Sequence, residues 1–277
     1  DLMLIAPATA NVLCKMANGI ADDALTTTFA AMRKPVVIAP AMNTNMYNSP
    51  ATQKAINELA QWQNITMIDC ANGELACGTM GKGRMQEVDV LVAAIEYALT
   101  PKTLKDKRVL ITAGPTQEAI DPVRYISNAS TGKMGYALVR ACLNRGAEVT
   151  LVTGPTHLSL NAWQVFCPLT IVNVVSSAEM CENTIAVFKQ TDITILCAAV
   201  ADFTPCKTAN KKIKKQELST DNSQLAIKLT TTTDIAATLG KEKEGRLLVG
   251  FALETHDEQT NALRKLQSKN LEIGRAH

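Results

Sequence analysis

Short apolar runs alternate with helix-length amphipathic segments along the whole chain, and this alternation limits the possible folds most strongly. The runs are continuously apolar, which is typical of strands buried on both faces of a parallel sheet. Strands that alternate with helices indicate α/β units joined by right-handed crossovers. We therefore predict an α/β protein with strands at LMLIAPA (2–8), PVVIAPA (35–41), NITMID (64–69), RVLITAG (108–114), AEVTLVTG (147–154), LTIVNVV (169–175), DITILCAAV (192–200) and RLLVGFA (246–252).

A polar, Lys-rich segment at 99–108 separates a predicted helix from a new strand, and we interpret it as a linker. Since 277 residues suit about two domains, we predict domains at 1–100 and 101–277. The first has 6 Lys and Arg against 9 Asp and Glu, and the second has 22 against 17. A basic second half favours an anionic ligand, although a solvated Lys-rich face is the commoner explanation.

Several classes of protein do not fit this composition. No apolar run approaches the roughly 18 residues of a membrane span. The eight Cys are scattered without a CxxC pair, which is typical of reduced cytosolic thiols, and the three His show no metal-ligand spacing. We expect a cytoplasmic homo-oligomer with small-molecule substrates and neither a membrane nor a nucleic-acid partner. Because the chain starts within a predicted strand and stops at NLEIGRAH, we expect a fragment lacking structure at both ends.

Four motifs in the first half are candidates for function: PATAN (7–11), GIADDALTT (19–27), PAMNTNM (40–46) and ACGTMGKGRM (76–85). PATAN lies where a strand ends and a helix begins, which is where ligands bind in open α/β sheets, but Thr9 also suits plain helix capping. PAMNTNM combines Met sulfur with carboxamides, which suits a pocket for a flat ring. Its simpler interpretation is a turn and a helix start, with Met filling the core.

ACGTMGKGRM is the more specific motif. Its Gly residues at 78, 81 and 83 predict a mobile loop that passes close to a ligand. Cys77 is expected to be exposed in this loop, where Lys82 and Arg84 would favour its thiolate or bind an anion. Such a Cys is able to deliver a proton to a substrate.

Together these motifs resemble, in order and spacing, the flavin-dependent Cys decarboxylases that act on phosphopantothenoylcysteine. The signatures PAMNxxM and ACGxxGxGRM of that family stand here as PAMNTNM and ACGTMGKGRM. The resemblance implies that FMN is the cofactor, that Asn43 binds the substrate carboxylate and that Cys77 is the proton donor. It places the family's catalytic His before Asp1. Position 47 is Tyr where many relatives carry Trp, and we expect this difference to matter little. Residues assigned to cofactor or substrate are Thr9, Asn11, Met42, Met46 and Arg84.

The second half opens with a predicted strand, a long loop and a helix (108–144). No GxGxxG is present, and STGKMG lacks the P-loop spacing. Asn128, Ser130, Thr131 and Gly132 nevertheless precede the helix with donors for an anion. The loop before them exceeds the usual 2–6 residues of a βα connection, which favours a functional loop.

Three further motifs follow predicted strands. AAVADF (198–203) offers Ala198 and Ala199 for close approach and Asp202 as a base or a Mg²⁺ ligand. KTANKKIKK (207–215) holds five Lys, which usually form a solvated surface but here suit a flap over a triphosphate. Phe251, in GFALET, suits stacking on a base.

These pieces look like phosphopantothenate–cysteine ligase, which is fused to the decarboxylase in most bacteria and uses CTP. The resemblance implies two doubly wound domains, an incomplete flavodoxin-like flavoprotein followed by a Rossmann-like ligase domain. It places Asn128, Asp202 and Lys212 in the ligase site, with Mg²⁺. Residues assigned to the nucleotide are Ala198, Ala199, Thr233, Asp234, Ile235, Ala236, Phe251, Lys265 and Lys269. TTTTDIA stands where relatives often read KxPDI, and NLEIGRAH departs from the family's continuation.

The function implied is coenzyme A biosynthesis, from 4′-phosphopantothenate, cysteine and CTP to 4′-phosphopantetheine. A non-catalytic regulatory flavoprotein is an alternative, and the presence of Asn43, Cys77 and Lys212 argues against it. A nicotinamide-dependent reductase is a second alternative, and the missing GxGxxG disfavours it.

Overall fold

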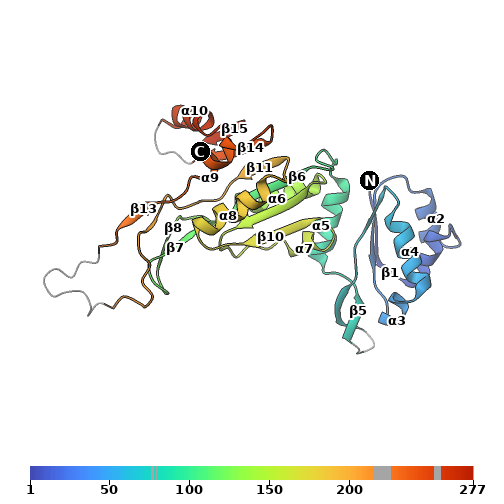
Figure 1. Ribbon diagram of the computed structural model, residues 1–277. Coiled ribbons are helices and arrows are strands. Elements are labelled where there is room, and N and C mark those ends of the chain that lie inside the picture. The colour runs from blue at the N-terminus through green and yellow to red at the C-terminus, as the bar shows by residue number, and fades with distance from the viewer. Residues whose placement is uncertain (76–77, 79, 215–225, 253–256, 277) are drawn as a thin grey trace. The chain divides into compact units, whose positions relative to one another are not determined.

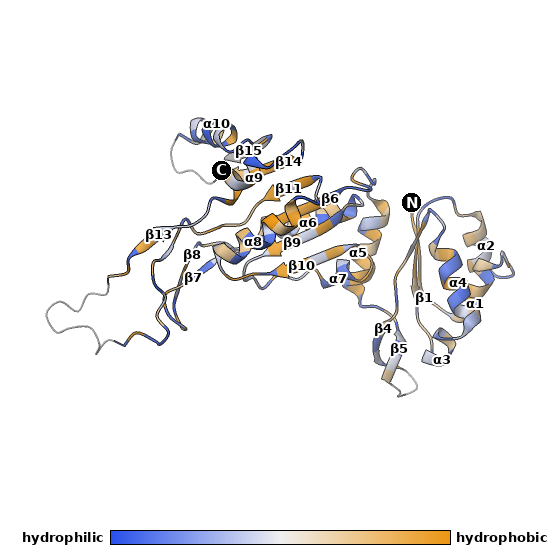
Figure 2. Cartoon of the chain, viewed as in Figure 1, coloured by the Kyte–Doolittle hydropathy of each residue, from blue (hydrophilic) through white to orange (hydrophobic). Residues whose placement is uncertain are grey.

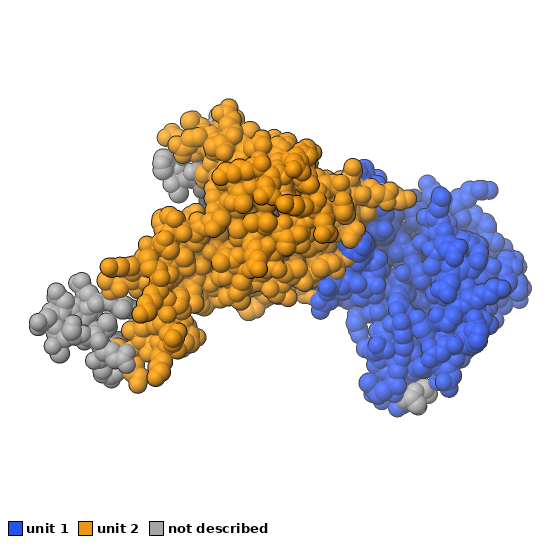
Figure 3. Space-filling view, in the orientation of Figure 1, with its two compact units in different colours: residues 1–103, 160–168 blue, residues 104–159, 169–277 orange. Residues whose placement is uncertain are grey.

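The chain divides into two compact units, which Figure 3 colours separately. The computed structural model describes residues 1–75, 78, 80–214, 226–252 and 257–276. Unit 1 comprises 1–103 and 160–168, and unit 2 comprises 104–159 and 169–277. The first boundary lies within the linker predicted at 99–108. Residues 160–168 also belong to unit 1, which was not expected from the sequence.

Unit 1 is built on a three-stranded parallel sheet of order β1-β2-β3, with an antiparallel hairpin β4–β5 (Figure 1). The strands are β1 (Met3–Ala8), β2 (Val36–Pro40), β3 (Ile65–Met67), β4 (Ala71–Glu74) and β5 (Met80–Arg84). The helices are α1 (Ala10–Ala17), α2 (Ala24–Ala31), α3 (Thr44–Tyr47), α4 (Pro50–Ala60), α5 (Val88–Leu99) and α7 (Asn161–Gln164).

Strand β2 is buried along its whole length, as its continuous apolar sequence predicts. Because side chains alternate along a strand, Val36 and Ile38 enter one core cluster, with residues of α1, α2 and α4. Val37 and Ala39 enter a second cluster, which contains residues of α5 and α7. The prediction of a strand covered on both faces is confirmed for β2.

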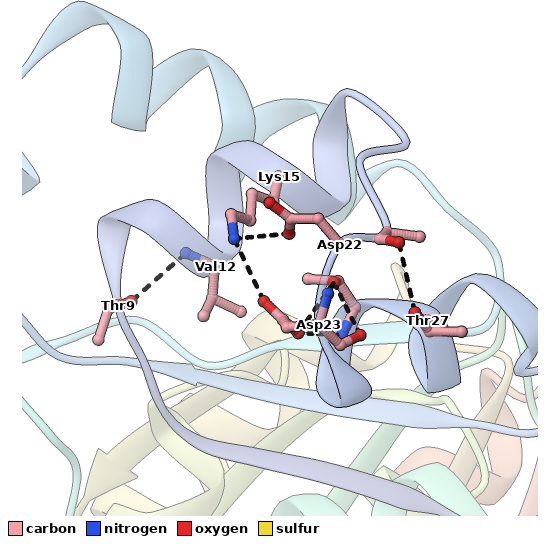
Figure 4. Close-up of polar contacts among 8 residues, drawn as sticks. Thr9, Val12, Lys15, Asp22, Asp23 and Thr27 are labelled. Atoms are coloured by element: carbon pink, nitrogen blue, oxygen red, sulfur yellow. Dashed lines mark hydrogen bonds and ion pairs between the residues drawn. The ribbon is translucent and has the colours of Figure 1, made fainter.

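Side-chain caps set the starts of the first helices of unit 1 (Figure 4). Thr9 Oγ1 accepts a hydrogen bond from the Val12 amide at 3.3 Å, so the predicted N-cap of α1 is confirmed. Asp23 and Thr26 form a capping box at α2. Lys15 joins the two helices, with Nζ 2.6 Å from Asp22 and 3.2 Å from Asp23. These contacts account for GIADDALTT as a structural motif.

Unit 2 contains a six-stranded parallel sheet of order β10-β9-β6-β11-β14-β15, which is the strand order of a doubly wound α/β fold. Figure 2 shows hydrophobic residues along its strands. The strands are β6 (Arg108–Ala113), β9 (Glu148–Thr153), β10 (Leu169–Asn173), β11 (Ile193–Leu196), β14 (Leu247–Ala252) and β15 (Ile273–Ala276). The helices are α6 (Lys133–Asn144), α8 (Ser177–Phe188), α9 (Ile235–Lys241) and α10 (Glu258–Ser268).

Two antiparallel ribbons lie in the long connections of unit 2. One pairs β7 (Gln117–Ala119) with β8 (Tyr125–Ser127), and the other pairs β12 (Phe203–Pro205) with β13 (Leu229–Thr231). They follow β6 and β11, whose carboxyl ends lie at the ligand-binding edge of the sheet. Among the described residues, no helix is both long and apolar enough to cross a membrane.

Candidate functional site

A cavity of about 400 Å³ lies at the carboxyl ends of β6, β11 and β14 in unit 2. Thr112, Leu196 and Gly250 of these strands line it, together with residues of the β13–α9 connection and of α10. This size is typical of small-molecule sites. Nine residues predicted from sequence line it: Ala198, Asp202, Thr233, Asp234, Ile235, Ala236, Phe251, Lys265 and Lys269.

Asp234 and Lys269 form an ion pair in the cavity wall, with Lys269 Nζ 2.8 Å from the carboxylate. Asp234 also caps α9, accepting from the Ala237 amide at 2.9 Å. Burial alone would raise the pKa of Asp234, but these bonds outweigh it and hold the pKa below its ordinary value. The sequence analysis assigned Lys269 to the nucleotide and did not identify Asp234 as its partner. The ion pair neutralises part of the charge of Lys269.

The loop after β11 is fixed by backbone contacts on both sides of Asp202. The buried Thr112 hydroxyl accepts from the amides of Cys197 (3.2 Å) and Ala198 (3.3 Å). Thr232 donates its amide to the Asp202 carbonyl at 3.0 Å and its hydroxyl to Ala201 at 2.7 Å. The Asp202 side chain is exposed at the cavity. In the described part of the chain no three His, Cys, Asp or Glu side chains gather into a group that could hold a metal ion, and the assignment of Asp202 to Mg²⁺ stays a prediction.

Asn128 lies outside the set of residues lining this cavity. Its side-chain amide donates to the carbonyls of Ala199 (3.3 Å) and Val200 (3.0 Å), which anchors the β8–α6 connection on the loop after β11. Ala199 itself forms an isolated parallel β-bridge with Pro115. Next to Asn128, Ser130 Oγ accepts from the Gly132 amide, and Gly132 caps α6. The predicted anion site at α6 is thus adjacent to AAVADF but distinct from the cavity lining.

Lys212 also lies outside the cavity lining, on an exposed segment that runs along the β7–β8 ribbon. The Ala209 amide donates to Ile120, and the Ile213 amide donates to Asp121. Arg124 donates to both the Asp121 carboxylate and the Ile213 carbonyl. These bonds hold the pKa of Asp121 well below its usual range, the arginine contributing most. The end of the Lys run, Lys215, lies outside the described residues.

Two backbones cross closely beside this edge of the sheet, at the ends of β6 and β9. The Gly154 amide donates to the Ala113 carbonyl at 3.0 Å. A Cβ at Gly154 would overlap the Pro115 carbonyl oxygen, far inside van der Waals contact. The loop that carries Pro115 therefore requires glycine at position 154.

A second cavity, of about 420 Å³, lies after β2 in unit 1. Three residues predicted from sequence line it, namely Met42, Asn43 and Arg84. Glu74 and Leu75 share the lining and were missed in the sequence, as was a role for Met85, the last residue of the motif ACGTMGKGRM. Asn43 also caps α3, accepting from the Asn45 amide at 2.8 Å. Other predicted residues are outside the lining: Thr9, Asn11 and Met46.

The prediction of a mobile glycine loop at 76–85 is wrong for residues 80–84, which form strand β5. The glycines serve close packing here. A Cβ at Gly81 would overlap Thr44 Oγ1, and a Cβ at Gly83 would overlap the Met42 carbonyl oxygen. Gly83 also has φ +144°, and its carbonyl oxygen accepts a hydrogen bond from the Met42 amide at 2.9 Å. Two motifs recognised separately in the sequence thus meet as one site. Cys77 and residues 76 and 79 lie outside the described residues.

Both cations of this motif have carboxylate partners. Arg84 pairs with Glu87 at 2.6 Å, and Lys82 pairs with Asp69. Asp69 also accepts from the Tyr47 hydroxyl at 2.6 Å. The position of Asp69 at the end of the predicted strand NITMID was the available sequence signal for this group.

The fold and these sites define a two-unit α/β protein that carries a cavity at the carboxyl ends of parallel strands in each unit. Residues 104–274 match the family described as "DNA/pantothenate metabolism flavoprotein C-terminal domain", and the chain belongs to this family. Residues 1–100 match a second family, described as "Flavoprotein".

Named relatives align over almost the entire chain. A "Coenzyme A biosynthesis bifunctional protein CoaBC" of Bacillus subtilis (strain 168) is 47% identical over 99% of this chain. The chain spans 66% of that relative's length. A "Cysteine/Cysteine sulfinic acid decarboxylase" of an unknown prokaryotic organism is 49% identical, and the chain spans 75% of it.

Among solved structures, the crystal structure of the C-terminal domain of a CoaBC protein is 41% identical, with a TM-score of 0.54. That similarity covers 64% of this chain and 79% of the other. A Cab2 mutant in complex with phosphopantothenate-cysteine has a TM-score of 0.52 at 18% identity. It covers 68% of this chain and 77% of the other, and it supports the fold alone.

Proposed function

We propose that this chain carries out two consecutive steps of coenzyme A biosynthesis. Unit 2 would join cysteine to 4′-phosphopantothenate with CTP, and unit 1 would decarboxylate the phosphopantothenoylcysteine formed. The cavity of unit 2 carries the proposal furthest, because nine residues chosen from the sequence line one pocket at the carboxyl ends of the strands. The names of the CoaBC relatives agree with it.

In the ligation, the phosphopantothenate carboxylate would attack the α-phosphate of CTP and release pyrophosphate. The cysteine amine would then attack the acyl carbon and release CMP. Asp202 would hold Mg²⁺ together with the phosphates, and Lys265, which lines the cavity, would face a phosphate. Phe251 would stack on the cytosine.

The ligase proposal is tested by incubating the chain with CTP, Mg²⁺ and phosphopantothenate in the absence of cysteine. Pyrophosphate release that needs both CTP and phosphopantothenate is the expected result, since the acyl-cytidylate would form before cysteine enters. Absence of release under these conditions, with CMP appearing only when cysteine is added, would rule out the separate activation step.

The residues of the unit 1 cavity fit a flavin ring. Met42, Leu75 and Met85 supply apolar contact, and Asn43 supplies a carboxamide for hydrogen bonding. Thr44 Oγ1 is buried without a hydrogen-bond partner in the described part of the chain. FMN bound here would supply the oxidation that makes carbon dioxide loss possible. Asn43 would orient the substrate carboxylate, and Cys77 would donate the final proton.

Cys77→Ser, made in a chain extended to include the residues before Asp1, is expected to separate carbon dioxide loss from product formation. Carbon dioxide release from phosphopantothenoylcysteine should continue, while the yield of 4′-phosphopantetheine falls and an oxidised enethiol accumulates, because the proton donor is missing. Mass spectrometry of the products with FMN present measures both. Wild-type yield of 4′-phosphopantetheine would remove Cys77 from this role. Free cysteine and cysteine sulfinic acid are the comparison substrates, because one relative is named for them.

A further inference from the structure

Tyr47, Asp69 and Lys82 connect the hairpin β4–β5 to helix α3. The Tyr47 hydroxyl donates to Asp69 Oδ1 at 2.6 Å, and Lys82 pairs with Asp69 Oδ2. The Cys70 amide donates to Asp69 Oδ1 at 2.8 Å. The Lys82 ammonium also lies 5.2 Å from the centre of the Tyr47 ring, within cation–π range. One carboxylate thus joins three elements: α3, the segment after β3, and β5.

The position of Lys82 on β5 gives this group its importance. Lys82 lies between Gly81 and Gly83, the residues whose missing side chains let β5 approach Thr44 and Met42. Because successive residues of a strand face opposite sides, Gly81 faces the Thr44 side chain, Gly83 faces the Met42 backbone, and Lys82 extends to the other side, where it pairs with Asp69. On the side of β5 that Gly81 and Gly83 face, the hydrogen bond from the Met42 amide to the Gly83 carbonyl holds the strand. A single such bond would hold β5 only weakly.

The charges of the group persist at neutral pH. Asp69 raises the pKa of Lys82 above its ordinary value. Burial would raise the pKa of Asp69, but the bonds from Lys82 and Tyr47 outweigh it and lower the pKa. The Tyr47 side chain is buried, and burial together with Asp69 raises the pKa of its hydroxyl, which therefore remains a donor.

We propose that Tyr47, Asp69 and Lys82 form a clasp that sets the position of β5 over Met42 and Asn43. The three are positioning residues for the unit 1 cavity, whose walls come from both sides of this contact. That the cavity is a substrate site rests on the proposed function. The clasp itself does not, and its test needs neither substrate nor FMN.

The test measures amide hydrogen exchange of the whole chain at two reporters. The Met42 amide is protected by Gly83 across the contact, and the Asn45 amide is protected by the Asn43 side chain. Lys82→Met, which keeps the aliphatic length and removes the cation, is expected to speed exchange of both by about tenfold. Tyr47→Phe, which removes one hydroxyl, is expected to act in the same direction.

Two variants serve as controls. Lys82→Arg retains the cation and is expected to stay within about twofold of wild type, which a merely space-filling role would not predict. Lys54→Met removes an exposed Lys on α4 of the same unit and should leave both amides unchanged.

Wild-type exchange at Met42 in both Lys82→Met and Tyr47→Phe would overturn the clasp. Equal acceleration at Ile38, in the core of β2, would also overturn it, because the effect would then be general destabilisation. Faster exchange at Met42 without any change at Asn45 would overturn the positioning of Asn43. Absence of decarboxylase activity in the wild-type protein would overturn the proposed function, but it would not affect the conclusions about the clasp.

Discussion

Gly154→Ala is expected to destabilise unit 2 by about 3 kcal/mol, which is a large effect for a single added methyl group. The new Cβ would overlap the Pro115 carbonyl oxygen, which is backbone and has no alternative rotamer. Either β9 or the loop after β6 must shift. Amide exchange in β6 and β9 measures the loss, and we expect the amides of Leu110 and Leu151 to exchange about two orders of magnitude faster.

Gly245→Ala is the matched control for this experiment. Gly245 also belongs to unit 2 and has φ +84°, but no atom lies within 4 Å of its added Cβ. Its substitution should cost about 1 kcal/mol through backbone strain alone. If the two variants have equal effects on exchange, the crossing at Pro115 is looser than the structure shows.

Lys212→Gln is expected to slow pyrophosphate release by roughly 100-fold, about 3 kcal/mol of lost transition-state stabilisation. The family resemblance places Lys212 in the ligase site, and the Lys run suits a flap over the triphosphate during acyl-cytidylate formation, although Lys212 lies outside the cavity lining. Binding of phosphopantothenate should change little, because the charge acts mainly in the transition state. The assay contains CTP, Mg²⁺ and phosphopantothenate without cysteine, and equilibrium binding of phosphopantothenate is measured separately.

Lys241→Gln is the matched control, since Lys241 is an exposed lysine at the end of α9 and should cost almost nothing. Asp202→Asn, which alters a carboxylate in the cavity wall, is expected to show the same loss, and added Mg²⁺ should relieve part of it. A wild-type rate in Lys212→Gln would identify KTANKKIKK as a solvated surface.

Apart from β15, the strands of both parallel sheets could be predicted, because burial on two faces leaves a continuous apolar run in the sequence. PVVIAPA and RVLITAG coincide with β2 and β6 on this basis. The short ribbons could not be predicted, since β4, β5 and β7 carry polar residues and glycine and no apolar pattern. Their pairing depends on contacts with distant parts of the chain, which local propensity does not encode.

The candidate sites were predictable where a residue follows a strand, because the carboxyl ends of parallel strands meet at one edge. Asp202, Phe251 and Asn43 were found in this way. The partners of charged residues were not predictable. Lys269 with Asp234 and Lys82 with Asp69 are pairs brought together by the fold, 35 and 13 positions apart in the sequence. The presence of Tyr in place of Trp at position 47 was expected to matter little, and the bond from its hydroxyl to Asp69 could not be seen in the sequence.

The assignment of residues 160–168 to unit 1 bears on how the protein is made. The Phe166 ring meets Tyr97 of α5 edge-on at 5.7 Å, and Ala162 enters the same core cluster as Val90. A ribosome releases these residues only after 104–159, which already belong to unit 2. The first unit therefore reaches its complete core while the second is partly synthesised. Because domains generally fold as units during synthesis, the core around α5 is completed only once Pro168 has emerged, after 56 residues of unit 2 (104–159).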